Sequence, residues 1–449
     1  MRSMDESDLE EFGRLGVEAA LREGADQAEA YGSISRSVRV WIDSSRVQYV
    51  RVIYDSGLGI RSYIDGGLGF SYITRLDKRL VEEAARKASK LARVAGKDPA
   101  FKSLPEPEEP RHVRGLYDEA LASIEAGEAV SIAQEMIKAA LEISEDIIIS
   151  GRLTISSSEY MISNSLGINH LGMDTSAYAS AMCIIKRSAD DVGAGAEFDA
   201  SRSLKGLDAE WVARKAAENS MRFLGARLMK TKVCTFLLSP NATMGLIYGL
   251  SDPLGGYAII LDRSCLAGKV GSKIASEILS LVDDGTVEGG VASSEVDGEG
   301  VPKRRFTVIE DGILKTYFHN SYTAIRTGME NNACAARASF RSPLTTAPSN
   351  LQVKRGDQSL EEIIGEIKDG IYVDSFPRAD PVTGNISAMI DFGIHIKNGE
   401  FAEPIKGTMI GSNLLDILRD IDAVSREVRD LDGIVMPYMR IRNVQIAGI

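Results

Sequence analysis

A run of short alternating segments, broken by turn residues, constrains the fold of this chain more than any other feature. Apolar and polar residues alternate over 37–42, 47–54, 58–64 and 68–73, and a period of two is typical of half-buried strands. Asp-Ser-Ser, Asp-Ser-Gly and Asp-Gly-Gly separate these segments, and such residues favour tight turns. The pattern therefore predicts an antiparallel meander near the start of the chain.

The order of strands followed by a helix occurs twice before residue 225. A helix is predicted over 76–94, after the first strands, and an amphipathic helix over 208–224, after the second set. The second set of strands is predicted over 146–153, 154–158, 160–163 and 177–186, after a helix over 128–144. Segregated strands and helices favour an α+β fold over a doubly wound parallel sheet.

The length of the chain predicts more than one domain. A chain of 449 residues is too long for one ordinary compact core. Four prolines among acidic residues over 96–110 indicate an exposed linker. We predict an α+β domain over 1–110, a second over 111–228, and a C-terminal mixed-sheet domain over 229–449.

The C-terminal part shows further helix and hairpin signals. Helical spacing of apolar residues predicts helices over 241–249, 268–281 and 412–424, and Asp311-Gly312 predicts a hairpin turn between two strands. The small residues Gly193-Ala194-Gly195 do not fit a dinucleotide-binding loop, and we interpret them as a turn.

Charge and hydropathy exclude two classes of partner. The net charge of −12 argues against nucleic acid, because binding to phosphates needs a basic surface. No run of about 18 uncharged apolar residues predicts a membrane span. The acidic N-terminus lacks the apolar core of a secretory signal, and the four dispersed cysteines are typical of reduced thiols. We expect a cytoplasmic protein.

The residues that could carry chemistry form no local motif. A zinc site needs three or four converging ligands, and no histidine lies within helical reach of another; the four are His112, His170, His319 and His395. The acidic segments 283–286 and 297–300 could instead form a paired-carboxylate site. Because these acids stand among Gly and Ser, we interpret both segments as solvated turns.

Several segments together resemble the TldD/PmbA family, whose members include metallopeptidases and proteins described as modulators of DNA gyrase. The similar segments occur in the order of the family and span almost the whole chain. They are LGIR at 58–61 with GFS at 69–71, EILSLVDDGT at 277–286, DGEGVPKRRFTVIEDGIL at 297–314, SYTAIR at 321–326, DPVTG at 380–384, GSNLLDILRDIDA at 411–423 and IAG at 446–448.

The resemblance implies the PmbA (TldE)-like branch, which lacks the zinc motif of the TldD branch. In the TldD branch a helix before VDDGT carries HExxxH, and the three motif positions correspond here to Ile247, Tyr248 and Asp252. Apolar Ile247 cannot bind zinc, and a phenol is a poor general base near pH 7. The family's cysteine ligand near the C-terminus is also missing, because no cysteine follows Cys334.

The resemblance further implies a non-zinc-binding subunit that binds no metal and no cofactor itself. Zinc is expected in a TldD-like metallopeptidase partner, and the two subunits would enclose a chamber for unfolded peptides; a homodimer is possible when the chain is alone. Two alternatives remain open. The chain is an autonomous metallopeptidase or hydrolase that recruits ligands such as Asp252, His319 and His395, or it is a binding protein that modulates gyrase.

Overall fold

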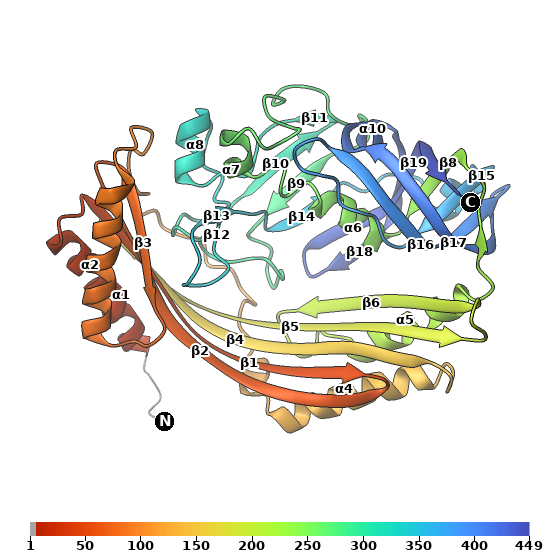
Figure 1. Cartoon of the computed structure of the whole chain (residues 1–449), viewed down its shortest axis with the longest axis horizontal. Helices are drawn as coiled ribbons and strands as arrows, with labels where there is room; N and C mark the ends of the chain where they lie inside the picture. Colours follow the sequence, from red (N-terminus) through yellow and green to blue (C-terminus); the bar gives the residue numbers. More distant parts are fainter. Residues whose placement is uncertain (1–5, 449) are drawn as a thin grey trace.

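The computed structural model describes residues 6–448. Its N-terminal half is built on one antiparallel six-stranded sheet, sheet A, with the order β3-β2-β1-β4-β5-β6. The sheet is strongly curved, and the C-terminal half of the chain lies over its concave face (Figure 1). The α+β prediction is confirmed. The strands are β1 Gln27–Asp43, β2 Arg46–Ile64, β3 Gly67–Ile73, β4 Ile148–Asn164, β5 Asn169–Lys186 and β6 Val192–Ser201.

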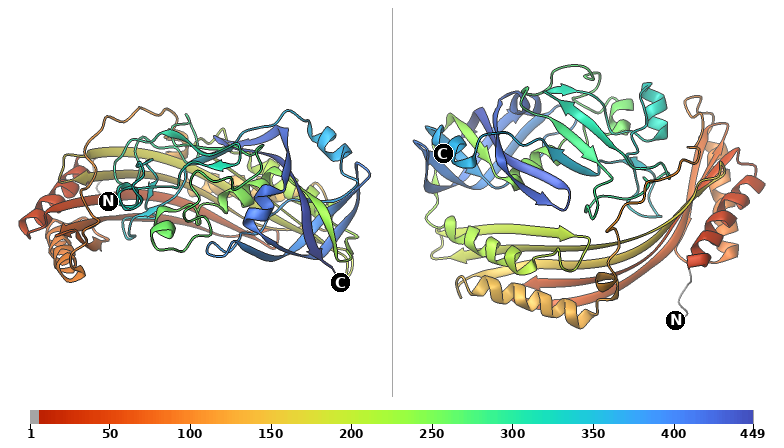
Figure 2. Two further views of the ribbon diagram at one scale, coloured as in Figure 1. Left: turned by 90° about the horizontal axis from the view of Figure 1, so that it is seen from above. Right: turned by 180° about the vertical axis from the view of Figure 1, so that it is seen from behind.

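Helices cover the convex face of sheet A at its two ends (Figure 2). Alternation along β1 explains this arrangement. Ala28 and Ala30 pack under α1 and α2, and Val38 and Val40 lie in the core under α4 and α5. All four are even-numbered, so they share one face of the strand, and odd-numbered residues of β1 face the concave side. The helices are α1 Glu6–Arg22, α2 Lys78–Ala95, α3 Glu119–Ser123, α4 Ala126–Leu141 and α5 Ala209–Arg222.

Strand β2 is one continuous strand, so the predicted turn at Asp55-Ser56-Gly57 was wrong. Its pairing with β1 runs unbroken through this segment, with Ile34 opposite Ser56. The turn-like residues serve contacts with the C-terminal half instead. Asp55 forms an ion pair with Arg341 at 2.6 Å, and a Cβ on Gly57 would lie 2.2 Å from the ring of Phe340.

Two further predictions in sheet A differ from the structure. The segments predicted over 146–163 as separate strands form the single strand β4. Gly193-Ala194-Gly195 lies within β6 and is not a turn. The glycines are there because α5 packs directly on their backbone: a Cβ on Gly193 would lie 2.1 Å from the Ser220 carbonyl oxygen, and one on Gly195 would lie 2.4 Å from that of Ala216.

The C-terminal half is built on an eleven-stranded mixed sheet, sheet B. Its order is β11-β10-β9-β14-β19-β8-β15-β16-β17-β7, and β18 pairs with β19. Because β17 also pairs with β19, the strands β19, β8, β15, β16 and β17 form a closed ring. The strands are β7 Arg227–Leu228, β8 Lys232–Leu238, β9 Leu281–Asp284, β10 Arg305–Glu310, β11 Ile313–Leu314, β14 Asn350–Val353, β15 Asp369–Val373, β16 Asn385–Lys397, β17 Glu400–Asn413, β18 Ile421–Leu431 and β19 Ile434–Ala447.

Short helices and a two-stranded hairpin complete this half. The predicted turn at Asp311-Gly312 is confirmed, since β10 pairs with β11 across it. The helices are α6 Pro240–Tyr248, α7 Gly256–Ile260, α8 Ser321–Thr327, α9 Leu360–Gly365 and α10 Leu414–Arg419, and the hairpin is β12 Ala335–Ala336 with β13 Thr345–Thr346.

Two predicted helices of this half were wrong in whole or in part. Residues 268–280 form turns and irregular backbone, because Gly268 and Gly271 adopt positive φ and Ile274 donates its N–H to the Gly312 carbonyl oxygen in the β10–β11 turn. Leu281 already begins β9. The helix predicted over 412–424 is limited to α10, and Ile421 already begins β18.

The two N-terminal units predicted from sequence share sheet A. Strand β1 of the first pairs with β4 of the second over fourteen residue pairs, from Glu29 with Asn164 to Ile42 with Gly151. Residue 110 lies in an extended segment between α2 and α3, and residue 228 ends β7. Among residues 6–448, no helix is long and apolar enough to cross a membrane.

Candidate functional site

Helix α6 carries Ile247 and Tyr248, the first two of the three positions that we predict to correspond to the family's zinc motif. Ser239 caps it by accepting a hydrogen bond from the Ala242 N–H at 3.2 Å, and Pro240 occupies its first turn. Ile247 is fully buried in the main core of the C-terminal half. The apolar residue at this position therefore packs sheet B.

Tyr248, at the second position, is held by the backbone of β14. Its hydroxyl donates to the Ser349 carbonyl oxygen at 3.0 Å and accepts from the Leu351 N–H at 3.4 Å. Burial raises the pKa of Tyr248, so the phenol stays protonated at neutral pH. The side chain anchors α6 to β14 and cannot act as a general base.

Asp252, at the third position, is exposed beyond the end of α6. These three side chains do not fit zinc: one is buried among apolar residues, one is engaged by backbone groups, and one faces solvent. Within residues 6–448 no three or more His, Cys, Asp or Glu side chains are grouped so that they could hold a metal ion. The segment 432–438, where the family's cysteine ligand would fall, forms the turn of the β18–β19 hairpin and the start of β19.

The four histidines lie in three separate places. His112 and His170 both approach Glu295, at 2.7 and 4.0 Å. His319 is buried beside Thr323, 3.2 Å from its hydroxyl, and burial lowers its pKa to about 4. His395 lies between Asp369 and Glu403 on sheet B, at 2.7 and 3.2 Å. Among the described residues, no hydrogen bond or ion pair joins His319 or His395 to Asp252.

The acidic segments interpreted as solvated turns are buried, so that interpretation was wrong. Asp283, Asp297 and Glu299 are 1%, 4% and 2% exposed. Burial raises the pKa of Asp283 to about 6. Burial and the neighbouring Glu299 raise that of Asp297 to about 7. Asp297 accepts three backbone hydrogen bonds, from Glu299, Val301 and Ala335, so its carboxyl group organises the loop around it.

A buried four-residue network, which we call the joint network, connects sheet A to the C-terminal half. Arg61 on β2 donates to Glu29 on β1 at 3.0 and 2.6 Å, and to Glu299 at 3.2 Å. Arg337 pairs with Glu29 from the other side. All four side chains are at most 4% exposed. Two cations and two anions thus balance each other across the two halves.

Phe340 reinforces this joint by packing on bare backbone of β2. A Cβ on Gly59 would lie 2.3 Å from the Phe340 carbonyl oxygen. Gly59 and Arg61 both belong to the LGIR segment, and Glu299 belongs to the DGEG segment. Two of the segments that carry the family resemblance therefore meet in space and hold the two halves together.

A pocket of about 650 Å³, the edge pocket, opens between β6 and the C-terminal half. Its volume is in the range of small-ligand sites. Asn241 and Gly245 of α6 line one wall, and Asp374 lies at the end of β15. Burial raises the pKa of Asp374, because its charged form loses solvation in the pocket wall. Aromatic and apolar side chains form the rest of the lining: Tyr178, Met182, Phe198, Phe223, Phe376 and Phe392.

The outer edge of β6 faces this pocket. Phe198 donates its N–H to its neighbour Glu197 and accepts from Arg429 with its carbonyl oxygen, so its backbone points away from β5. Backbone direction alternates along an antiparallel strand, so Ala194 and Ala196 point their N–H and C=O groups the same way. Both residues line the edge pocket, which therefore contains an open strand edge. No sequence motif marks this edge; only the pairing order of sheet A reveals it.

Comparisons with known proteins agree with this architecture. Models of the PmbA/TldA metallopeptidase family match as domain 1 over residues 28–92, as the central domain over 119–224 and as the C-terminal domain over 231–448. A protein named Metalloprotease PmbA from Escherichia coli O157:H7 is 24% identical over 458 residues, covering 98% of this chain and 96% of that one. A metalloprotease of Methanothermobacter thermautotrophicus is 25% identical, over 95% of this chain and 97% of that one.

A solved structure is similar over the same length. The crystal structure of TldE from Thermococcus kodakarensis superimposes with a TM-score of 0.87 at 26% identity, covering 98% of this chain and 100% of that one.

Proposed function

Because the chain belongs to the TldD/PmbA family, we propose that it is a non-zinc-binding subunit of a peptide-degrading complex. In this role it forms part of the wall of a chamber and holds unfolded peptide for a zinc-bearing, TldD-like partner. The open edge of β6 inside the edge pocket is the observation that carries the proposal.

An extended peptide suits this edge physically. Added strands bind mainly through backbone hydrogen bonds, so they tolerate many sequences. Ala194 and Ala196 supply such groups, and their small side chains leave room for the incoming strand. The apolar lining accepts a bulky side chain of the peptide, and Asp374 accepts a hydrogen bond from it. A site of this kind would bind many different peptide sequences, provided that each offers one apolar side chain to the pocket. Such a loose sequence preference suits a protein that processes unfolded chains.

The residues at the zinc-motif positions support a structural role for this chain and a catalytic role for the partner. Ile247 contributes to the core, and Tyr248 is bonded to β14, so both have structural roles here. We therefore assign the zinc and the attacking water to the TldD-like partner.

The first test measures metal and activity together. The purified chain is analysed for bound zinc and for cleavage of casein, alone and after mixing with a TldD-like protein from the same organism. We expect the lone chain to be inert and metal-free, and the mixture to cleave with about one zinc per pair. Stoichiometric zinc and cleavage by the lone chain would instead support the autonomous metallopeptidase.

The second test addresses the strand edge. An apolar peptide that binds the chain is compared with versions that are N-methylated at alternate residues, which removes donors from one edge only. One of the two alternating patterns should abolish binding. Equal binding of both methylated peptides would show that the edge pocket does not act by strand addition. The variant Ala196→Pro, which removes a donor pointing to the free edge, should reproduce the loss.

A further inference from the structure

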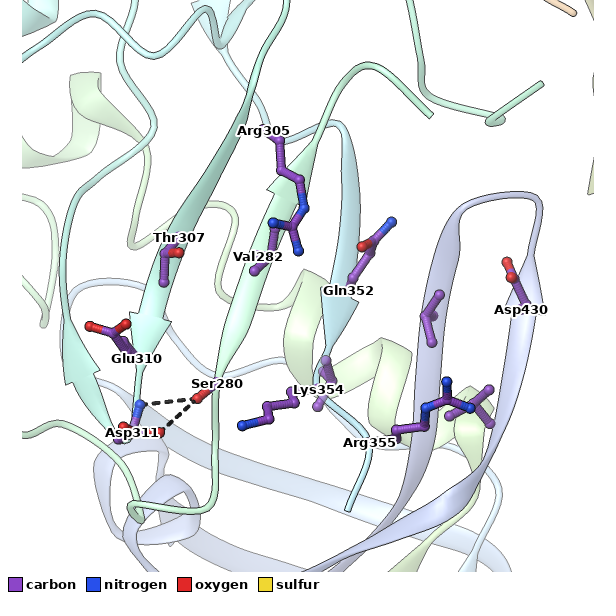
Figure 3. Close-up of a pocket in the computed structure, with 13 residues that line it drawn as sticks. Ser280, Val282, Arg305, Thr307, Glu310, Asp311, Gln352, Lys354, Arg355 and Asp430 are labelled. Carbon is purple, nitrogen blue, oxygen red and sulfur yellow. Dashed lines mark hydrogen bonds between the residues drawn. The ribbon is translucent and has the colours of Figure 1, made fainter. Parts of the chain in front are cut away.

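The two surfaces of this chain that gather cations differ in how far their charge is balanced. The pocket formed by β9, β10, β14 and the β18–β19 hairpin, of about 690 Å³, carries as many carboxylates as cations (Figure 3). Its charged side chains are Glu310, Asp311, Asp430, Arg305, Lys354 and Arg355. Because these charges balance, this pocket favours neither an anion nor a cation. The second surface, on sheet A, is not balanced.

Arginine and aromatic side chains contact one another in a row across sheet A, near the β1–β2 turn. Trp41 on β1 stacks on Tyr49 on β2, with 5.0 Å between the ring centroids. Arg51 lies over the ring of Tyr49, 4.8 Å from its centroid. Arg152 on β4 lies over both Trp41 and Tyr178, 6.0 and 5.6 Å from their centroids. With one further arginine, we call this set the arginine ladder: Arg39, Trp41, Tyr49, Arg51, Arg152 and Tyr178.

The register of sheet A places the ladder on the concave face. Trp41 lies opposite Tyr49 on one side and opposite Arg152 on the other, and directly opposite residues share a face of the sheet. Arg39 lies opposite Arg51 in the same way. The even-numbered residues of β1 pack under α4 and α5 (Figure 2), so the odd-numbered ones face away from these helices.

The arginines of this surface exceed its carboxylates. In the part of the chain that the structure describes, no carboxylate forms an ion pair with Arg39, Arg51 or Arg152, and the Nε atom of Arg39 is buried without a hydrogen-bond partner. The strand segments that build the surface contain these three arginines, Arg46 and the single carboxylate Asp43; they are 37–43, 46–53, 150–156 and 176–182. On a chain with a net charge of −12, this excess of positive charge is a local exception.

The contacts within the ladder decide which kind of anion it suits. The ring of Trp41 contacts Tyr49 on one side and Arg152 on the other, so a nucleic-acid base would have to displace a neighbour before it could stack there. Arg51 and Arg152 are exposed, and a stacked guanidinium group still presents N–H donors that match a carboxylate. Stacking also restrains these long side chains, so they lose less freedom on binding. The ladder therefore favours carboxylates over bases.

The ladder reaches the edge pocket. Tyr178 belongs to both, and its ring stacks on Phe198 of β6 with 6.1 Å between centroids. Arg152 on β4 is two strands from β6, and Arg51 on β2 is four strands from it. These separations correspond to about 10 and about 19 Å, or to about three and about six residues of an extended chain.

The acidic groups of the edge pocket lie on its other side. Glu197 forms an ion pair with Arg429 of β18 at 2.7 Å, and Asp374 follows β15, so both face the C-terminal half. Strand β5 separates β6 from the ladder strands β4, β1 and β2. A peptide anchored in the pocket by an apolar side chain can thus extend over the ladder without passing these acids.

We propose that the arginine ladder binds acidic residues of the peptide that the edge pocket holds. The inference rests on the function proposed above and names its substrate class: unfolded peptides with acidic residues about three to six positions from an apolar anchor. Carboxylates nearest the anchor bind Arg152, and those further along bind Arg39 and Arg51, in each case through charge-assisted hydrogen bonds.

Three labelled peptides test this preference by fluorescence anisotropy with the full chain. Each has one Phe as anchor in a Gly-Ser background. Two carry Glu three to six positions before or after the Phe, and the third carries Gln on both sides. We expect one Glu peptide to bind about tenfold more tightly than the Gln peptide. This advantage should vanish at high salt, because exposed charges are screened.

A double variant removes two arginines of the ladder that do not line the edge pocket. Arg39→Gln/Arg51→Gln should reduce the advantage of the Glu peptide to about threefold or less. The matched control is Arg75→Gln/Arg79→Gln, which removes the same charge at exposed positions before and within α2 and should keep the advantage. Circular dichroism checks that both variants are folded.

The outcomes separate this inference from the function on which it rests. Equal losses in the two double variants would show that net charge alone attracts the peptide, and would overturn the inference. Equal binding of the Glu and Gln peptides would also overturn it, but would leave the peptide-holding function intact. Failure of all three peptides to bind would overturn both. A single-stranded oligonucleotide that binds the ladder more tightly than the Glu peptide would overturn the inference in favour of nucleic acid.

Discussion

Removing the cation at the centre of the joint network should destabilise the protein strongly. In Arg61→Met the side-chain volume is largely kept, but Glu299 loses its side-chain cation while it remains 2% exposed. Glu29 keeps Arg337, so one negative charge is left uncompensated in a buried site. Breaking a buried ion pair from one side costs about 3–5 kcal/mol, and we expect a loss of free energy of unfolding in that range.

Urea unfolding followed by tryptophan fluorescence measures this loss of stability in sheet A. Both tryptophans, Trp41 and Trp211, lie in the N-terminal half, on β1 and α5, so the signal reports on sheet A. The double variant Arg61→Met/Glu299→Gln removes both charges and should recover part of the loss, because the pair of Glu29 and Arg337 is neutral by itself.

A surface ion pair provides the comparison. Arg86, 51% exposed, pairs with Glu23 at 3.0 Å, and Arg86→Met should cost less than about 1 kcal/mol. The reasoning is refuted if Arg61→Met costs no more than Arg86→Met. It is refuted equally if adding Glu299→Gln deepens the loss, since the uncompensated charge would then not be its cause.

Three other variants test further parts of the structure. The pKa of Asp297 is raised to about 7 in the fold. The protonated carboxyl group therefore stabilises the fold fully at a pH below about 3.9, the pKa of Asp in the unfolded chain, and this stabilisation is lost as the pH rises through about 7. Asp297→Asn should flatten the pH dependence of urea unfolding between pH 4 and 7. Gly59→Val should separate the two halves, because a Cβ there would lie 2.3 Å from the Phe340 carbonyl oxygen; limited proteolysis should then release a fragment. Tyr248→Phe leaves the Ser349 carbonyl oxygen without its donor and should lower stability by about 1–2 kcal/mol, while proteolysis by the mixture with a TldD-like protein stays unchanged.

Local patterns in the sequence predicted the elements but not the long-range contacts. The helices α2, α5 and α6 follow from apolar spacing and capping, because these signals act within a few residues. Asp297 and Glu299 were assigned to solvent because glycines surround them. Their burial depends on Arg61 of sheet A, 238 positions from Glu299 along the chain, and no local pattern reports such a partner.

The same limit explains the missed edge pocket. Positions 193 and 195 require glycine because α5 packs directly on their backbone. In the sequence, glycines required by such packing cannot be told from glycines of a flexible turn. The open edge of β6 follows from its end position in sheet A, and strand order depends on pairing across the whole half. That Ile247 and Tyr248 are unsuited to hold zinc stays a prediction, made from the chemistry of their side chains alone.

The position of β19 determines when this protein can finish folding. Strand β19 pairs with β8, β14, β17 and β18, so sheet B lacks its central member until residues 434–447 have left the ribosome. Sheet A ends at Ser201 and can form earlier during synthesis, as N-terminal domains generally do. The nascent chain therefore passes through a stage in which a finished, curved sheet exposes its concave face, with the ionic groups of Glu29 and Arg61 still in water, before the second half closes over them.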